Sequence, residues 1–270
     1  MFTFSKEHKQ FLKEKKKEKR IVLFYQIFIC FVFISLWELL FHFSIINSFL
    51  FSSPSKIFNT IISLIKSGNL FRHIFITILE VIISFSLSSI LGIFIASLLW
   101  RFERLAKILD PYIVVFNSLP KVALGPLIII WVGASINSII FMALTISIFS
   151  TIITIYNGFM SVEKKYIILL KSFGAKPMQV YQKVVLPSNL SLIFSTLKIN
   201  ISLSLIGVIM GELLVSKSGL GFLIMYGSQV FQLDLVICSV FILGIVSYLM
   251  YIIVDKISYF IKKKKKYFFS

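Results

Sequence analysis

Residues 164–187, KKYIILLKSFGAKPMQVYQKVVLP, form the longest well-charged break within the apolar body of this chain. The stretch holds five lysines, a glycine placed where a helix would stop, and a Leu-Pro pair placed where a new apolar segment would start. A residue in the left-handed conformation closes many helices, and Gly174 suits such a position. The stretch therefore predicts two short helices, about 162–171 and 177–185, between two longer apolar segments.

The composition on either side of this stretch is that of a membrane protein. Of 270 residues, 58% are hydrophobic, 16% are aromatic and only 14% are charged, against about 25% charged in soluble domains. The mean hydropathy is +0.95. The polar side chains are too few to cover the surface of a soluble globule. Lipid must therefore solvate much of the surface. The net charge of +17 lies in tails and short loops, which indicates membrane topology and argues against a nucleic-acid partner.

Six segments are apolar and long enough to cross a bilayer, which takes about 20 residues. They are 21–43, 75–100, 111–132, 136–160, 188–211 and 235–254. The third holds Pro120 and Pro126 and is expected to be kinked. A shorter amphipathic helix is expected after Ser53-Pro54-Ser55, ending at Ser67-Gly68-Asn69, and a Gly-rich loop is expected over 216–234. The predicted fold class is an all-α polytopic membrane helix bundle.

The distribution of positive charge predicts which segments face the cytoplasm. Lysine and arginine number eight in residues 1–20, three in 101–110, five in 161–187 and six in the C-terminal tail, which is 22 of 28. Six spans return both basic tails to one side, and the positive-inside rule assigns that side to the cytoplasm. The opening stretch is therefore expected to be cytoplasmic, together with both termini.

The sequence offers no catalytic or metal-binding constellation. The histidines His8, His42 and His73 do not fall into a metal-binding spacing. There is no Gly-x-Ser-x-Gly elbow and no glycine-rich phosphate loop with a lysine. We therefore expect no catalytic residue, no metal and no cofactor. If the chain moves a solute uphill, the energy must come from a partner or an ion gradient.

The predicted cytoplasmic loop is more apolar than a solvated connector needs to be. Tyr166, Ile167, Leu169, Leu170 and Phe173 all fall within its first helix or directly after it. An apolar hairpin that stays outside the membrane is explained by a protein partner. The alternative is a plain amphipathic connector between two spans.

The loop resembles the cytoplasmic loop of ABC importer permeases, the binding-protein-dependent transport inner-membrane family. Gly174 is followed by nine residues and then Val184-x-Leu186-Pro187, as in that family's motif. Ile168-Leu169-Leu170 stand where the family has Glu-Ala-Ala. Further stretches are similar, in order and spacing, to the nitrate, sulfonate, taurine and bicarbonate branch, over about residues 50–255. They are Phe51–Ser55, Leu109–Pro111, Ser118–Pro126, Trp131–Gly133 and Ser218–Gly221.

The resemblance implies a type I importer permease of the MetI-like architecture. Such permeases act as pairs, and a homodimer is expected here. Each subunit contacts one cytoplasmic ATPase through a coupling helix, and an extracytoplasmic binding protein delivers the solute. The coupling residues that the resemblance implies are Ile168, Leu169, Leu170, Phe173, Gly174, Ala175, Leu186 and Pro187. Without the motif's glutamate, docking is expected to depend on shape and apolar contact.

The implied domain organisation follows the predicted topology in a bacterial plasma membrane. Residues 1–20 form a basic cytoplasmic tail, and 21–50 form the first transmembrane helix with its outer loop. Residues 51–258 form the permease core, with five transmembrane helices and the coupling loop 161–187. Residues 259–270 form a Lys-rich cytoplasmic tail expected to lie on anionic lipid.

Four polar residues in or near spans are candidates for the translocation path: Asn117, Lys121, Lys198 and Glu212. Ionisable groups in spans usually face a bundle interior or a wet cavity. A lysine in the kinked third span suits an anion-like solute, of the sulfonate, nitrate, bicarbonate or thiamine-precursor class. The alternatives are structural: Glu80 could pair with Lys121 or Lys198, and the neutral groups could bond helix to helix.

The Ser218–Gly221 turn could contact the binding protein, act as an outer gate or be a simple tight turn.

Two other function classes compete with the permease hypothesis. An ion-coupled secondary transporter would show internal repeats and acidic coupling residues at the midplane of the membrane. No repeat is visible, and Glu80 and Glu212 lie near span ends. A membrane enzyme or assembly factor is disfavoured by the missing nucleophile and metal-ligand sets.

Overall fold

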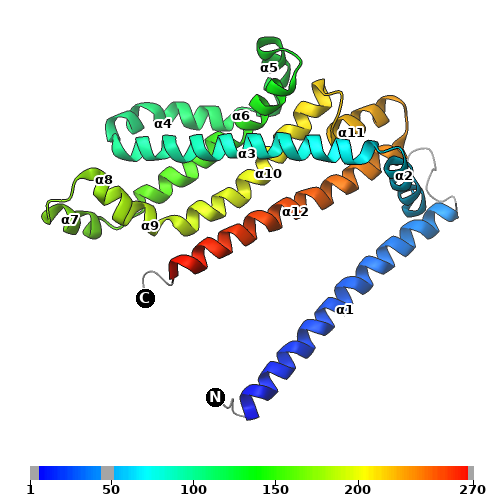
Figure 1. Cartoon of the computed structure of the whole chain (residues 1–270), viewed down its shortest axis with the longest axis horizontal. Helices are drawn as coiled ribbons and strands as arrows, with labels where there is room; N and C mark the ends of the chain where they lie inside the picture. Colours follow the sequence, from blue (N-terminus) through cyan, green and yellow to red (C-terminus); the bar gives the residue numbers. More distant parts are fainter. Residues whose placement is uncertain (1–5, 44–51, 267–270) are drawn as a thin grey trace.

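Helices make up every regular element in the part of the chain that the structure describes, residues 6–43 and 52–266 of a computed structural model (Figure 1). Five of them are long and apolar enough to cross a membrane. They are α1 (Lys6–His42), α3 (Asn69–Arg101), α6 (Ile136–Met160), α10 (Leu190–Val215) and α12 (Leu233–Lys266). The predicted all-α polytopic bundle is confirmed. The ends of both predicted tails and most of the first outer loop, with Phe51, lie outside the described residues.

The third predicted span is broken rather than kinked. It consists of α4 (Glu103–Ser118), the 3₁₀ turn η1 (Lys121–Leu124) and α5 (Gly125–Val132), bent by 86°. The break falls at Leu119, whose ψ of 142° is extended because the ring of Pro120 disfavours a helical residue before it. Pro126 lies in the first turn of α5, where its missing N–H costs nothing. With this pair counted as one crossing, the spans number up to six.

Two shorter helices lie at the same end of the bundle (Figure 1). The predicted helix α2 (Pro54–Lys66) is confirmed, and Ser53 caps it by accepting a hydrogen bond from the Lys56 N–H at 3.3 Å. The expectation of a loop over 216–234 is wrong, because α11 (Leu220–Gln229) forms within it. Its first N–H groups are capped by two side chains of the distant helix α3 and by Glu212 of α10, and local sequence does not reveal the contacts with α3.

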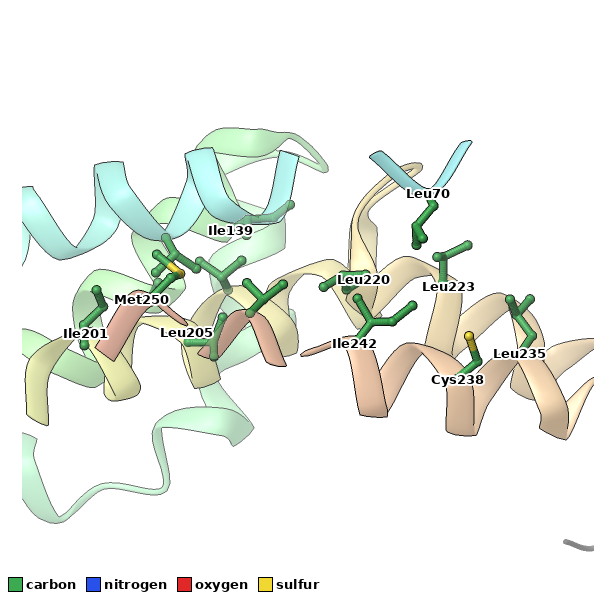
Figure 2. Close-up of a cluster of buried hydrophobic side chains, with 14 of the residues drawn as sticks. Leu70, Ile139, Ile201, Leu205, Leu220, Leu223, Leu235, Cys238, Ile242 and Met250 are labelled. Carbon is green, nitrogen blue, oxygen red and sulfur yellow. The ribbon is translucent and has the colours of Figure 1, made fainter. Parts of the chain in front are cut away.

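The centre of the bundle is formed by α3, α6 and α10. On α10, Gly207 and Gly211 are four residues apart and face α6, where a Cβ atom on either would collide with Ala143 or Ile139. Small residues at this spacing let two membrane helices approach closely. A buried apolar cluster then joins α10 to α11 and α12 (Figure 2). It includes Leu205, Leu220, Leu223, Cys238 and Ile242.

The first helix stands apart from the rest of the bundle except at one end (Figure 1). There the Trp37 indole N–H donates to the Ser52 carbonyl at 3.0 Å, and the Glu38 carboxylate accepts from the N–H and hydroxyl of Ser55. Most other apolar side chains of α1 are exposed. Lipid or a second protein chain must cover them. The helix is continuous through residue 20, so the predicted boundary there is one of composition only.

The two ends of the bundle carry different features. The short helices α7 (Lys164–Ser172), α8 (Pro177–Val180) and α9 (Leu186–Ser188) lie at the end where α3 and α12 finish (Figure 1). Helices α2 and α11 lie at the opposite end. We refer to residues 164–188 as the α7–α9 hairpin, and to residues 216–221 as the α10–α11 turn.

Candidate functional site

The α7–α9 hairpin turns at Gly174 through a Schellman motif. The Gly174 N–H donates to the Lys171 carbonyl at 2.9 Å, and the Ala175 N–H donates to the Leu170 carbonyl at 3.0 Å. Gly174 has a φ of +77°, in the left-handed region that favours glycine. The predicted helix stop is thus confirmed, and the first helix runs over Lys164–Ser172. The second predicted helix is made of α8, the π-helical turn η2 (Tyr181–Val185) and α9.

The inner side of the hairpin is anchored to three long helices. Val180 and Val185 are buried in an apolar cluster that contains residues of α3, α6 and α10. Tyr181 ties the hairpin to α3, since its hydroxyl lies 2.6 Å from the Ser97 hydroxyl and its ring packs against Trp100. These contacts join the hairpin to α3, α6 and α10.

The outer side of the hairpin is apolar and exposed. Phe173 is 80% exposed, Ile168 64% and Leu169 53%. By contrast, Leu170, Ala175 and Leu186 pack against the buried cluster, and Pro187 is partly buried. The structure thus divides the predicted coupling residues into an exposed apolar face (Ile168, Leu169 and Phe173) and an inner anchor. The turn at Gly174 directly follows this face.

The four predicted path residues do not form one site. Asn117 and Lys121 meet at the break between α4 and η1, where the lysine Nζ lies 3.1 Å from the asparagine Oδ1. Lys198 pairs with Asp255 on α12. Glu212 lies at the α10–α11 turn. The alternative pairing of Glu80 with a lysine is wrong, because neither Lys121 nor Lys198 forms a salt bridge with it among the described residues.

The Lys121 ammonium has neutral partners among the described residues. Besides Asn117, it donates to the Ile146 carbonyl of α6 at 3.3 Å and lies 5.9 Å from the centre of the Phe149 ring. No described carboxylate forms a salt bridge with it. A partly buried cation without an acidic partner is a suitable group for attracting an anion. The sequence indicated both Asn117 and Lys121, and the structure places them in contact at the break.

Lys198 has a structural partner that sequence reasoning missed. It forms an ion pair with Asp255 and lies 5.9 Å from the Tyr251 ring centre, so it joins α10 to α12. The signal available in sequence was Asp255 itself, an acid at the end of an uncharged span.

Replacing Lys198 by methionine or Asp255 by asparagine is expected to lower the thermal unfolding temperature of the detergent-solubilised protein. The double exchange Lys198→Asp with Asp255→Lys should restore most of the loss, since it rebuilds the pair. The measurement is a thermal unfolding curve for the parent protein, the two single variants and the exchanged pair. An exchanged pair that unfolds at no higher temperature than the single variants would rule out a direct pairing.

The α10–α11 turn is held by side chains from two long helices. The N–H groups of Gly219, Leu220 and Gly221 donate in turn to His73 Nδ1, Thr77 Oγ1 and Glu212 Oε2, at 2.9, 2.9 and 2.5 Å. Sequence reasoning named Glu212 and the turn but missed His73 and Thr77. Their four-residue spacing on one helical face was the available signal.

Comparison with known proteins identifies the family. Residues 88–267 match the family model described as "Binding-protein-dependent transport system inner membrane component". The chain is 29% identical to the putative aliphatic sulfonates transport permease protein SsuC of Bacillus subtilis, over 80% of this chain and 78% of that protein. It is also 29% identical to the formylaminopyrimidine transport permease protein ThiX of Halalkalibacterium halodurans, over 77% of this chain and 83% of that protein.

The fold has a solved counterpart in the MetNI methionine ABC transporter in its inward-facing conformations. The TM-score is 0.61 at 20% identity, covering 72% of this chain and 96% of that chain. This likeness confirms the MetI-like architecture, while the family match covers most of the permease core. The chain therefore belongs to the binding-protein-dependent transport system inner membrane components, the permeases of ABC importers.

Proposed function

We propose that this chain is the membrane-spanning subunit of an ATP-driven importer, that it forms the solute path, and that it takes its energy from a separate ATPase. The observation that carries the proposal is the α7–α9 hairpin. Its exposed apolar face is supported by a buried anchor on α3, α6 and α10. Such a device converts a movement of the partner into a movement of the spans.

The proposed orientation places the hairpin, the N-terminal tail and the C-terminal tail in the cytoplasm. The Lys/Arg counts support this orientation. The α10–α11 turn and α2 then face the extracytoplasmic side, where a binding protein would deliver the solute. The proposed organisation is a basic tail to residue 20, a first span and outer loop to residue 50, a permease core over 51–258, and a Lys-rich tail from residue 259.

We further propose that two copies of this chain form the path together. The broken span presents exposed aromatic side chains, among them Tyr112 and Phe116 on α4 and Trp131 on α5. The apolar surface of α1 is also uncovered in the single chain. Both surfaces are suited to a neighbouring permease subunit, and Lys121, at the break, would then face the space between the copies.

The proposed solute is a small anion-like molecule of the sulfonate, nitrate, bicarbonate or thiamine-precursor class. The names of the sulfonate and formylaminopyrimidine permease relatives support this range. The test is reconstitution of the chain in proteoliposomes with its ATPase and binding protein. Uptake should require all three proteins and ATP. Uptake driven by an ion gradient without the ATPase would support the secondary-transporter alternative instead.

Replacing Lys121 by glutamine is expected to reduce anionic solute uptake about tenfold, the loss of roughly one charge-assisted hydrogen bond. Lys121→Arg should retain most of the uptake, because it keeps the positive charge. Lys198→Gln is the matched control, since that lysine is paired with Asp255. The measurement is the initial rate of uptake of labelled solute at equal protein levels. Equal reductions of the uptake rate in Lys121→Gln and Lys198→Gln would show that Lys121 has no special role in the path.

A further inference from the structure

Glu80 and Glu212 form a buried pair of acids next to the α10–α11 turn. Glu80 on α3 is 2% exposed and Glu212 on α10 is 1% exposed. Their carboxyl groups are hydrogen-bonded to each other. No described lysine or arginine forms a salt bridge with either of them. Two carboxylates cannot share a hydrogen bond without a proton, and two buried like charges in contact repel strongly.

The surrounding hydrogen bonds indicate which acid carries the proton. Glu212 accepts from the Thr77 hydroxyl at 2.6 Å with Oε1 and from the Gly221 N–H at 2.5 Å with Oε2. Thr77 can donate its single proton to Glu212, because its oxygen accepts from the Leu220 N–H. Both oxygens of Glu212 thus act as acceptors, as in a carboxylate. Glu80 Oε2 has no hydrogen-bond partner among the described residues, which suits the carbonyl oxygen of a neutral acid.

We propose that Glu80 is a protonated carboxylic acid that donates to the Glu212 carboxylate, and that this proton latches the α10–α11 turn to α3. The Glu212 carboxylate caps the N-terminus of α11, where negative charge is favourable. Thr77 links the two by contacting both Glu212 and Leu220. When the Glu80 proton passes to hydroxide, two carboxylates are left in contact. Their repulsion then separates α10 from α3 and frees the N–H groups at the start of α11.

Other titratable groups lie near this latch. His73 on α3 accepts the Gly219 N–H through Nδ1, so the latch needs that nitrogen unprotonated. Arg72 and Lys217 are exposed. On the α12 side, Cys238 is buried in the cluster that contains Leu220 and Leu223. The test is therefore made from about pH 7, where histidine is mostly neutral, to about pH 10, in a Cys238→Ala background.

The experiment is hydrogen–deuterium exchange of the full-length chain in lipid nanodiscs, read in the peptide that contains Gly219, Leu220 and Gly221. Exchange is corrected for its intrinsic pH dependence, with the turn of residues 133–135 as an internal control. In the parent protein, protection of these amides should fall at least about tenfold across the range, as their capping bonds open. Glu80→Gln keeps a hydrogen-bond donor that does not ionise. In that variant the protection of the three amides should stay constant across the pH range. Glu80→Leu removes the hydrogen-bond donor, so in that variant the three amides should already be poorly protected at pH 7.

Infrared spectroscopy tests directly whether Glu80 carries a proton. It does not depend on the relative stabilities of the parent protein and its variants. The parent protein should show the C=O band of a buried protonated carboxylic acid at neutral pH, and that band should be absent in Glu80→Gln. Absence of the band in the parent protein would overturn the proposal. Equal pH dependence of amide protection in the parent and Glu80→Gln would overturn it as well. Neither readout involves transport, so the outcome is independent of the proposed function.

Discussion

Replacing Gly174 by valine is expected to reduce ATP-driven uptake by about tenfold or more. Gly174 has a φ of +77°, and a Cβ atom there would meet nothing within 4 Å. The effect therefore comes from backbone strain alone, which costs about 1 to 3 kcal/mol for a non-glycine residue in this region. Relief of that strain would reposition α7 relative to its anchor. The measurement is uptake in proteoliposomes, together with the stimulation of ATPase activity by the permease.

The chain offers a matched control for this substitution. Gly68 follows α2 with a φ of +72°, and a Cβ atom there would also meet nothing within 4 Å. Gly68→Val introduces the same kind of strain away from the hairpin and should leave the coupling of ATP hydrolysis to uptake intact. Gly174→Asn should retain most of the activity, because asparagine tolerates the left-handed conformation. Equal losses for Gly68→Val and Gly174→Val would indicate a general folding defect.

Replacing Phe173 by alanine is expected to weaken binding of the ATPase subunit about 30-fold or more, since aromatic anchors at an interface contribute about 2 kcal/mol or more. Phe173 is highly exposed in the single chain, next to Ile168 and Leu169. Because it packs little against its own chain, its loss should leave the stability of the permease nearly unchanged. The measurement is the affinity of the purified permease for its ATPase, together with a thermal unfolding curve.

Phe58→Ala provides the comparison for Phe173→Ala. Phe58 on α2 is also highly exposed and lies at the end of the bundle opposite the hairpin. Its replacement should therefore have no effect on ATPase affinity. An unchanged affinity in Phe173→Ala, with the permease still folded, would contradict the proposed docking face.

The membrane-spanning helices were largely predictable from sequence, because lipid as a solvent requires long apolar segments with internally satisfied backbones. The segment 136–160 coincides with α6. The stop at Gly174 was also predictable, since it depends on one local backbone conformation. The size of the bend at Leu119-Pro120 was not, because a proline marks a break without fixing the angle between the two helices.

The polar contacts between helices could not be read from the chain. The helix α11 was missed because its N-terminus is capped by His73, Thr77 and Glu212, more than 140 residues away in the case of His73 and Thr77. Similarly, Lys198 has the sequence signature of a path residue, but its partner in the structure is Asp255 of α12. In both cases an ionisable group in a span had a partner on another helix, and the pairing depends on the three-dimensional packing.

The most direct test of the central claim is site-specific photo-cross-linking from position 173. A photoreactive phenylalanine analogue at Phe173 in the full-length chain is irradiated in native membranes, and the cross-linked partner is identified by mass spectrometry. The account predicts an ABC ATPase subunit as the cross-linked protein, and no such product from the same analogue at Trp131. A cross-link to lipid alone at position 173, in membranes where the ATPase is present, would contradict it.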